Sequence, residues 1–175
     1  DETLLRELSL PSDDLQITAT GSIAVGGVLA FYTEGGDVPM SIGADAGGGS
    51  WDLDDAEIGR ISAAESIVIG EDAVQGTGPV ETSVTTVDLS GVTGLTSTEI
   101  NADAGAGGVY LDDEDTAPAL QVGSGTISIN AGTGDILAAG FSYPDPAYDL
   151  AQPEIQTTGT INLTISSTSA GQIGA

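Results

Sequence analysis

The chain has 175 residues, of which 27 are Asp or Glu and only 2 are Lys or Arg, so its formal net charge is −25. This composition lacks the clustered cations that bind nucleic-acid phosphates or anionic membrane surfaces, so neither partner is expected. A hydrophobic content of 39% argues against a disordered acidic chain, and the absence of Cys excludes disulfides and thiolate metal ligands.

The first ten residues, DETLLRELSL, predict a short helix. Leu4, Leu5 and Leu8 form a short apolar stripe at helical spacing, and Pro11 stops the pattern. We expect residues 1–14 to form an N-terminal helical cap over the end of the fold, with the three leucines at an interface. The alternative is a segment that docks onto a neighbouring subunit.

Short runs of Ile, Val and Leu recur throughout residues 15–175, separated by Gly, Asp, Asn, Ser and Thr. This pattern is typical of many brief strands joined by tight corners. The segments ITATGSIAV (residues 17–25) and ISINAGTGDI (residues 127–136) share an alternation of apolar and polar residues around a Gly corner. Such recurrence indicates a repeat fold, with roughly 20 residues in each turn.

The sequence therefore predicts an all-β fold, a right-handed parallel β-helix, or β-solenoid, formed by residues 15–175. Stacked turns bury their apolar rows against one another and satisfy their backbone groups between turns. Residues 141–153, FSYPDPAYDLAQP, contain three Pro and two Tyr and are expected to form an excursion on the outside of the stack. An antiparallel β-sandwich is the alternative fold.

Residues 51–70 resemble the repeats of filamentous-haemagglutinin-like surface proteins of Gram-negative bacteria. The resemblance depends on Trp51, the acidic stretch Asp52–Glu57, an Ile-rich strand over Ile58–Ile61 and the strand SIVIG over Ser66–Gly70. It implies a secreted, cell-surface β-helix with an adhesive or fibre-building role, and a cell-surface or carbohydrate ligand. Because the chain begins with Asp1, we expect a processed protein or an excised fragment.

Two acidic clusters are candidate Ca²⁺ sites, because carboxylate oxygens are the ligands that this ion prefers. Their candidate ligands are Asp52, Asp54 and Asp55 in one cluster and Asp112, Asp113 and Asp115 in the other. Neither cluster matches the spacing of an EF-hand loop or of a Ca²⁺-binding solenoid repeat. The alternative is a pair of solvated acidic corners, in which case the chain has no cofactor.

Catalysis is not expected, because His and Lys are absent and the chain therefore lacks the usual general bases. The leading hypothesis is a structural segment or subunit of an extracellular β-solenoid fibre or adhesin that assembles by head-to-tail stacking. An acidic module that binds Ca²⁺ or a surface without catalysis is the second hypothesis. A polysaccharide-active β-helix enzyme is the third.

Overall fold

The computed structural model describes eleven segments, and in them the chain forms short strands and one helix, α1 (Asp55–Ile58). These segments are residues 7–11, 20–32, 40–43, 51–70, 80–82, 87–102, 108–111, 118–132, 134–138, 155–165 and 173–174. Every strand pair within them is parallel. The prediction of an all-β chain is confirmed for these segments, and the alternative of an antiparallel β-sandwich is wrong for them.

The described strands make two six-stranded sheets, one three-stranded sheet and one two-stranded sheet. In spatial order, the first sheet contains β1 (Glu7–Pro11), β3 (Val28–Tyr32), β7 (Ser66–Ile69), β10 (Ser97–Asn101), β13 (Thr126–Asn130) and β16 (Ile161–Thr164). The second sheet contains β5 (Trp51–Leu53), β4 (Met40–Ile42), β8 (Val80–Thr82), β11 (Val109–Leu111), β14 (Ile136–Ala138) and β17 (Ile173–Gly174). The third sheet contains β9 (Val87–Asp88), β12 (Leu120–Gln121) and β15 (Ile155–Gln156), and the two-stranded sheet pairs β2 (Ile23–Ala24) with β6 (Ile61–Ala63).

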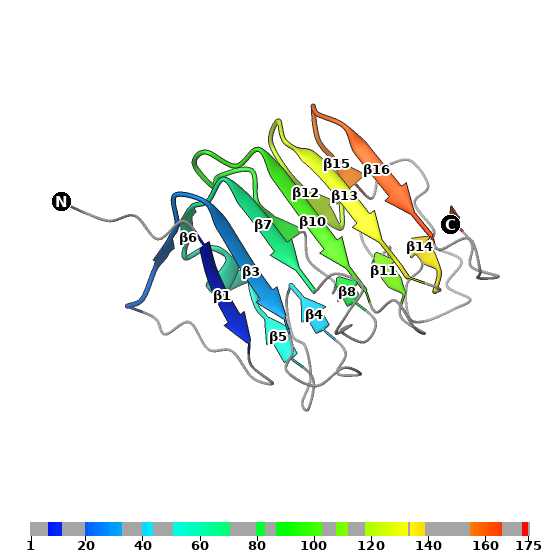
Figure 1. Ribbon diagram of the computed structural model, residues 1–175, viewed down its shortest axis with the longest axis horizontal. Helices are drawn as coiled ribbons and strands as arrows, with labels where there is room; N and C mark the ends of the chain where they lie inside the picture. The colour runs from blue at the N-terminus through cyan, green and yellow to red at the C-terminus, as the bar shows by residue number, and fades with distance from the viewer. Residues whose placement is uncertain are drawn as a thin grey trace.

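The chain passes through the first, second and third sheets in turn, as β7–β8–β9, then β10–β11–β12, then β13–β14–β15. We call one such pass a layer. In Figure 1 the layers follow one another in sequence order, from the blue β1 at one end of the first sheet to the orange β16 at the other. Each strand therefore pairs with its equivalents in the layers before and after it.

The layers are longer than the sequence pattern indicates. Ser66 and Ser97 occupy equivalent positions 31 residues apart, and Ser128 and Asn162 are 34 residues apart. The expected period of roughly 20 residues is therefore wrong for these layers. The reason is that one layer contains three strands and the three connections between them, whereas the apolar alternation marks only the strands.

The core lies between the sheets, where apolar residues at equivalent positions form continuous rows. Alternate residues of the four inner strands of the first sheet, β3, β7, β10 and β13, are buried, as expected from the two-residue period of a β-strand. The inner rows of this sheet contain Leu29, Ile67, Thr98 and Ile127 in one row and Phe31, Ile69, Ile100 and Ile129 in the other. The second sheet contributes the buried row Met40, Val80, Val109 and Ile136.

Successive layers lie close together at the corner that leads into the first sheet. A Cβ atom on Gly125 would lie 2.9 Å from the carbonyl carbon and oxygen of Thr96 in the preceding layer. A Cβ atom on Gly159 would overlap the carbonyl oxygen of Gly125. The Thr126 amide donates a 2.9 Å hydrogen bond to the Thr96 carbonyl across this contact. Glycine is thus required here for close approach of the backbones.

Two predictions about secondary structure are wrong. Residues 7–11 form strand β1, paired in parallel with β3, so the predicted helix does not extend over Leu8 and does not end at Pro11. Backbone pairing along the edge of the first sheet overrides the local helical pattern here. Ile58 belongs to α1 rather than to a strand, and the strand β6 begins at Ile61.

The strands predicted within 66–70 and 127–136 are confirmed as β7 and β13. The predicted excursion over 141–153 lies outside the described residues. The start of the N-terminal cap, with Leu4 and Leu5, also lies outside them.

Candidate functional site

The last strand of the first sheet, β16, exposes two large apolar side chains. Ile161 is 42% exposed and Leu163 is 38% exposed. They lie in register with Ile127 and Ile129 of β13, which are 0% and 1% exposed. The inner rows of the core therefore continue into β16, and there they end without a further layer of described residues upon them.

Backbone groups are also directed away from the stack at this end. The Ile127 amide donates to the Thr160 carbonyl at 2.8 Å, and the Ala131 amide donates to the Thr164 carbonyl at 3.1 Å. In a parallel strand, residues direct their N–H and C=O groups alternately to one neighbour and to the other. Since Thr160 and Thr164 face β13, the backbone groups of Ile161 and Leu163 face the free edge.

The opposite end of the first sheet is the edge strand β1. Pro11 lies in register with Tyr32 of β3. The equivalent position after β7 is Gly70, whose amide donates to the Phe31 carbonyl of the preceding layer at 2.8 Å. By this alternation the nitrogen of Pro11 faces the free edge, where a proline removes one donor without breaking the sheet.

The acidic cluster at the start of α1 forms a helix cap. The Asp54 carboxylate accepts a 2.7 Å hydrogen bond from the Glu57 amide, and the Glu57 carboxylate accepts a 3.1 Å bond from the Asp54 amide. This reciprocal arrangement is a capping box, which satisfies two backbone donors at the start of a helix. This function of Asp54 was not predicted, although the D-x-x-E spacing before an Ile is its sequence signal.

The predicted Ca²⁺ ligands are only partly described. Asp54 and Asp55 are exposed at α1, and Asp52 lies in β5, where the backbone alone is described. Asp112, Asp113 and Asp115 lie outside the described residues. Within the described segments, no three acidic, His or Cys side chains come together as a metal site. Ca²⁺ binding stays a prediction.

Of the three predicted interface leucines, Leu8 alone lies in the described part of the chain. Leu8 lies in β1, in register with Leu29, whereas Leu4 and Leu5 are outside the described part of the chain. Leu8 therefore lies at one end of the first sheet, and Ile161 lies at the other end. An interface role for Leu8 stays a prediction, and it would have to come from a strand rather than from a helix.

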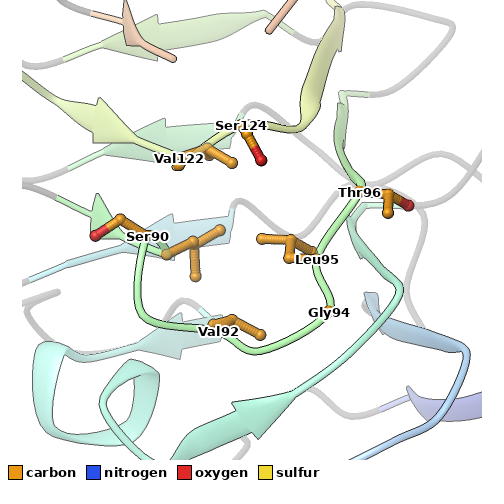
Figure 2. Close-up of a pocket in the computed structure, with 9 residues that line it drawn as sticks. Ser90, Val92, Gly94, Leu95, Thr96, Val122 and Ser124 are labelled. Atoms are coloured by element: carbon orange, nitrogen blue, oxygen red, sulfur yellow. The ribbon is translucent and has the colours of Figure 1, made fainter. Parts of the chain in front are cut away.

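A cavity of about 340 Å³ lies where the connection after β9 projects beyond the shorter connection after β12. Its lining contains no ionisable group; the residues are Leu89, Ser90, Val92, Gly94, Leu95, Thr96, Val122, Gly123 and Ser124. Figure 2 shows Leu95 pointing into the loop, with the hydroxyl groups of Ser90 and Thr96 pointing away from it on opposite sides.

Both of these hydroxyl groups already have partners. Ser90 Oγ donates to the Asp88 carboxylate at 2.5 Å, and Thr96 Oγ1 donates to the Glu65 carbonyl at 2.9 Å. The cavity is a notch between two layers, lined by aliphatic side chains, hydroxyl groups and backbone, without an acid or a base. It lacks the pair of positioned groups that general acid–base or nucleophilic catalysis requires.

Comparison with models of protein families, with curated proteins and with solved structures found no match. The resemblance of residues 51–70 to filamentous-haemagglutinin-like proteins therefore stays a prediction. Among the described residues, no helix is long and apolar enough to cross a membrane.

Proposed function

We propose that this chain is a structural segment of an extracellular fibre or adhesin, folded as a right-handed parallel β-helix that assembles head to tail. Three passes through the same three parallel sheets support the β-helix. Right-handedness follows from the strong preference of parallel crossover connections for that hand. The secreted location and the adhesive role are what the resemblance of residues 51–70 to filamentous-haemagglutinin-like proteins implies.

The observation that carries the proposal is the exposed apolar end at β16. Side chains equivalent to Ile161 and Leu163 are buried in the inner layers, so this end has the composition of a core without a cover. A free, apolar strand edge favours pairing with another strand. Because the two ends of the stack differ, a contact between them is heterologous and does not close, which builds a filament.

The net charge of −25 opposes this contact and makes it dependent on salt. We expect the protein to be a monomer at low ionic strength and to assemble as salt screens the repulsion. At about 1 M salt the Debye length falls to roughly 3 Å, so long-range repulsion between copies is removed. Light scattering and negative-stain images across a salt series measure this assembly directly.

The test is the substitution Ile161→Glu, which places a charge on the apolar end. Because Ile161 is already exposed, the isolated protein is expected to stay folded. We expect the variant to remain a monomer at salt and protein concentrations where the wild type forms filaments. Asn162→Glu adds the same charge at the adjacent position of the same strand, and we expect it to retain assembly.

Two results would overturn the proposal. One is a wild-type protein that stays monomeric throughout the salt and concentration series. The other is assembly of Ile161→Glu at the wild-type concentration, which would mean that the apolar end takes no part in the contact.

A further inference from the structure

We infer that the head-to-tail contact continues both six-stranded sheets at once, with β16 of one copy paired to β1 of the next and β17 paired to β5. This inference rests on the proposed function and specifies its partner as a second copy in one register. In that register Leu8 lies over Ile161, Leu10 over Leu163 and Trp51 over Ile173.

The first observation is that the two sheets begin and end in the same layers. β1 pairs with β3 on the side away from β7, and β5 pairs with β4 on the side away from β8. Since β3 and β4 are consecutive in one layer, β1 and β5 both lie one layer before it. At the other end, β16 and β17 extend the layer of β13 and β14 by one strand each. The two sheets therefore end in the same layer at each end of the stack. A second copy moved along the stack axis brings its β1 to β16 and its β5 to β17 at the same time.

The second observation is the register of the inner rows. Leu8 is in register with Leu29 and, through β7, β10 and β13, with Ile161. Leu10 follows the same path through Phe31 to Leu163. A copy added in unchanged register continues two apolar rows without a break. A shift by one residue would remove both leucines from the rows and place Ser9 with either Glu7 or Pro11 there.

The third observation is the direction of the backbone groups. Ile161 and Leu163 direct their N–H and C=O groups outward from the last layer, and Ser9 occupies the outward-directed position of the first layer. Parallel pairing between these edges completes the ladder at each position except one. The exception is Pro11, which has no N–H to offer to the Leu163 carbonyl of the other copy.

The fourth observation is that no like charges meet between the described edge strands in this register. Glu7 falls opposite Thr160, Ser9 opposite Asn162, and Asp52 of β5 opposite Gly174 of β17. The repulsion between copies therefore comes from the charge of the whole chain, which salt screens, and not from a fixed pair at the junction.

Disulfide formation tests this register directly, because the chain has no Cys. Neighbouring strands lie about 4.8 Å apart, which is within the Cα separation that a disulfide spans. We expect the double variant Ser9→Cys/Asn162→Cys, oxidised in salt that assembles the wild type, to give a ladder of covalent oligomers on a non-reducing gel. The two positions lie at opposite ends of the first sheet, so a bond within one copy is excluded (Figure 1).

The matched control is Ser9→Cys/Thr164→Cys, which moves one cysteine two residues along the same strand. The Cα separation then exceeds about 7 Å, beyond the reach of a disulfide, so no ladder is expected. Ser128→Cys/Asn162→Cys is the positive control for oxidation, since these residues are in register within one copy. It is expected to remain a monomer with an internal disulfide.

The outcomes separate the register from the assembly. A ladder from the Thr164 pair, or a covalent dimer from Asn162→Cys alone, means a shifted or tail-to-tail contact and overturns the inference while filaments persist. Filaments without any cross-link in the Ser9 pair overturn it as well. Loss of filaments in the wild type overturns the proposed function together with this inference.

Pro11→Ala supplies a second measurement. It restores the missing donor at the junction, and we expect the concentration needed for half-assembly to fall by about 2- to 10-fold. An unchanged concentration, with the variant folded as the wild type, would show that Pro11 does not lie at the junction and would overturn the proposed pairing of β16 with β1.

Discussion

Thr98 is a polar residue in the apolar core of the first sheet. It is completely buried, in register between Ile67 and Ile127, and its hydroxyl group has no hydrogen-bond partner. An unsatisfied buried hydroxyl costs about 1–3 kcal/mol of stability. Thr98→Val replaces the hydroxyl by a methyl group of similar shape. We therefore expect the free energy of unfolding to rise by about 1–3 kcal/mol.

Urea denaturation under monomeric, low-salt conditions measures this change. We expect the midpoint to move to higher urea while the slope m stays unchanged, because the surface exposed on unfolding is the same. In thermal unfolding, each kcal/mol raises Tm by about 2–4 °C for a domain of 150–250 residues.

Two further variants separate the hydroxyl from the methyl group. Thr98→Ser keeps the unsatisfied hydroxyl and removes one methyl group, so we expect it to lose about 1 kcal/mol. Thr164→Val makes the same change on an exposed residue of β16 and should lie within about 0.5 kcal/mol of the wild type. A Thr98→Val protein less stable than the wild type would refute the reasoning, because it would mean that the hydroxyl is satisfied.

Other predictions concern the corners, the helix cap and cations. Gly125→Ala is expected to destabilise the protein, because the added Cβ would lie 2.9 Å from the Thr96 backbone. Moving that backbone aside strains its geometry, so we expect a loss of more than about 1 kcal/mol. In Gly91→Ala the added Cβ would have no atom within 4 Å, so we expect the free energy of unfolding to rise by about 0.4–1 kcal/mol. Urea denaturation measures both variants, and equal changes in stability would contradict the close contact between Gly125 and Thr96. Asp54→Ala removes the helix cap and should lower the free energy of unfolding by about 0.5–2 kcal/mol. Asp54→Asn keeps a side-chain oxygen that can accept the same hydrogen bond, so it should retain most of that stability. Ca²⁺ and Mg²⁺ at matched ionic strength should raise Tm equally by screening, and a larger rise with Ca²⁺ would indicate a formed site.

Local patterns of the sequence identify strands well where alternation is clean. The segment TISIN, residues 126–130, alternates apolar and polar residues and its burial follows that alternation, whereas VLAFY, residues 28–32, is hydrophobic throughout and its burial alternates all the same. The strand 7–11 is the exception, because ELSLP lies at the end of a helical pattern and is ordered by pairing with β3. A partner from another layer is not visible in the local sequence.

The length of a layer could not be predicted for a related reason. Alternation marks only the residues that face the core, whereas the connections between strands carry no periodic signal. The connection from β9 to β10 runs from residue 89 to residue 96, and that from β12 to β13 runs only from 122 to 125. The number of residues between equivalent positions thus depends on how far each connection leaves the stack.

The candidate site could not be read from residue types at all. Ile161 and Leu163 have the same sequence pattern as Ile127 and Ile129, and their different exposure comes only from their place in the last layer. In a protein built of stacked layers, every inner layer presents the surface that the end presents, and the next layer covers it. A binding surface of this kind is a property of position, so only the strand order reveals it. It also means that the surface best suited to cover β16 is a strand of the same sheet, in the same register and direction, and β1 of a second copy meets all three conditions.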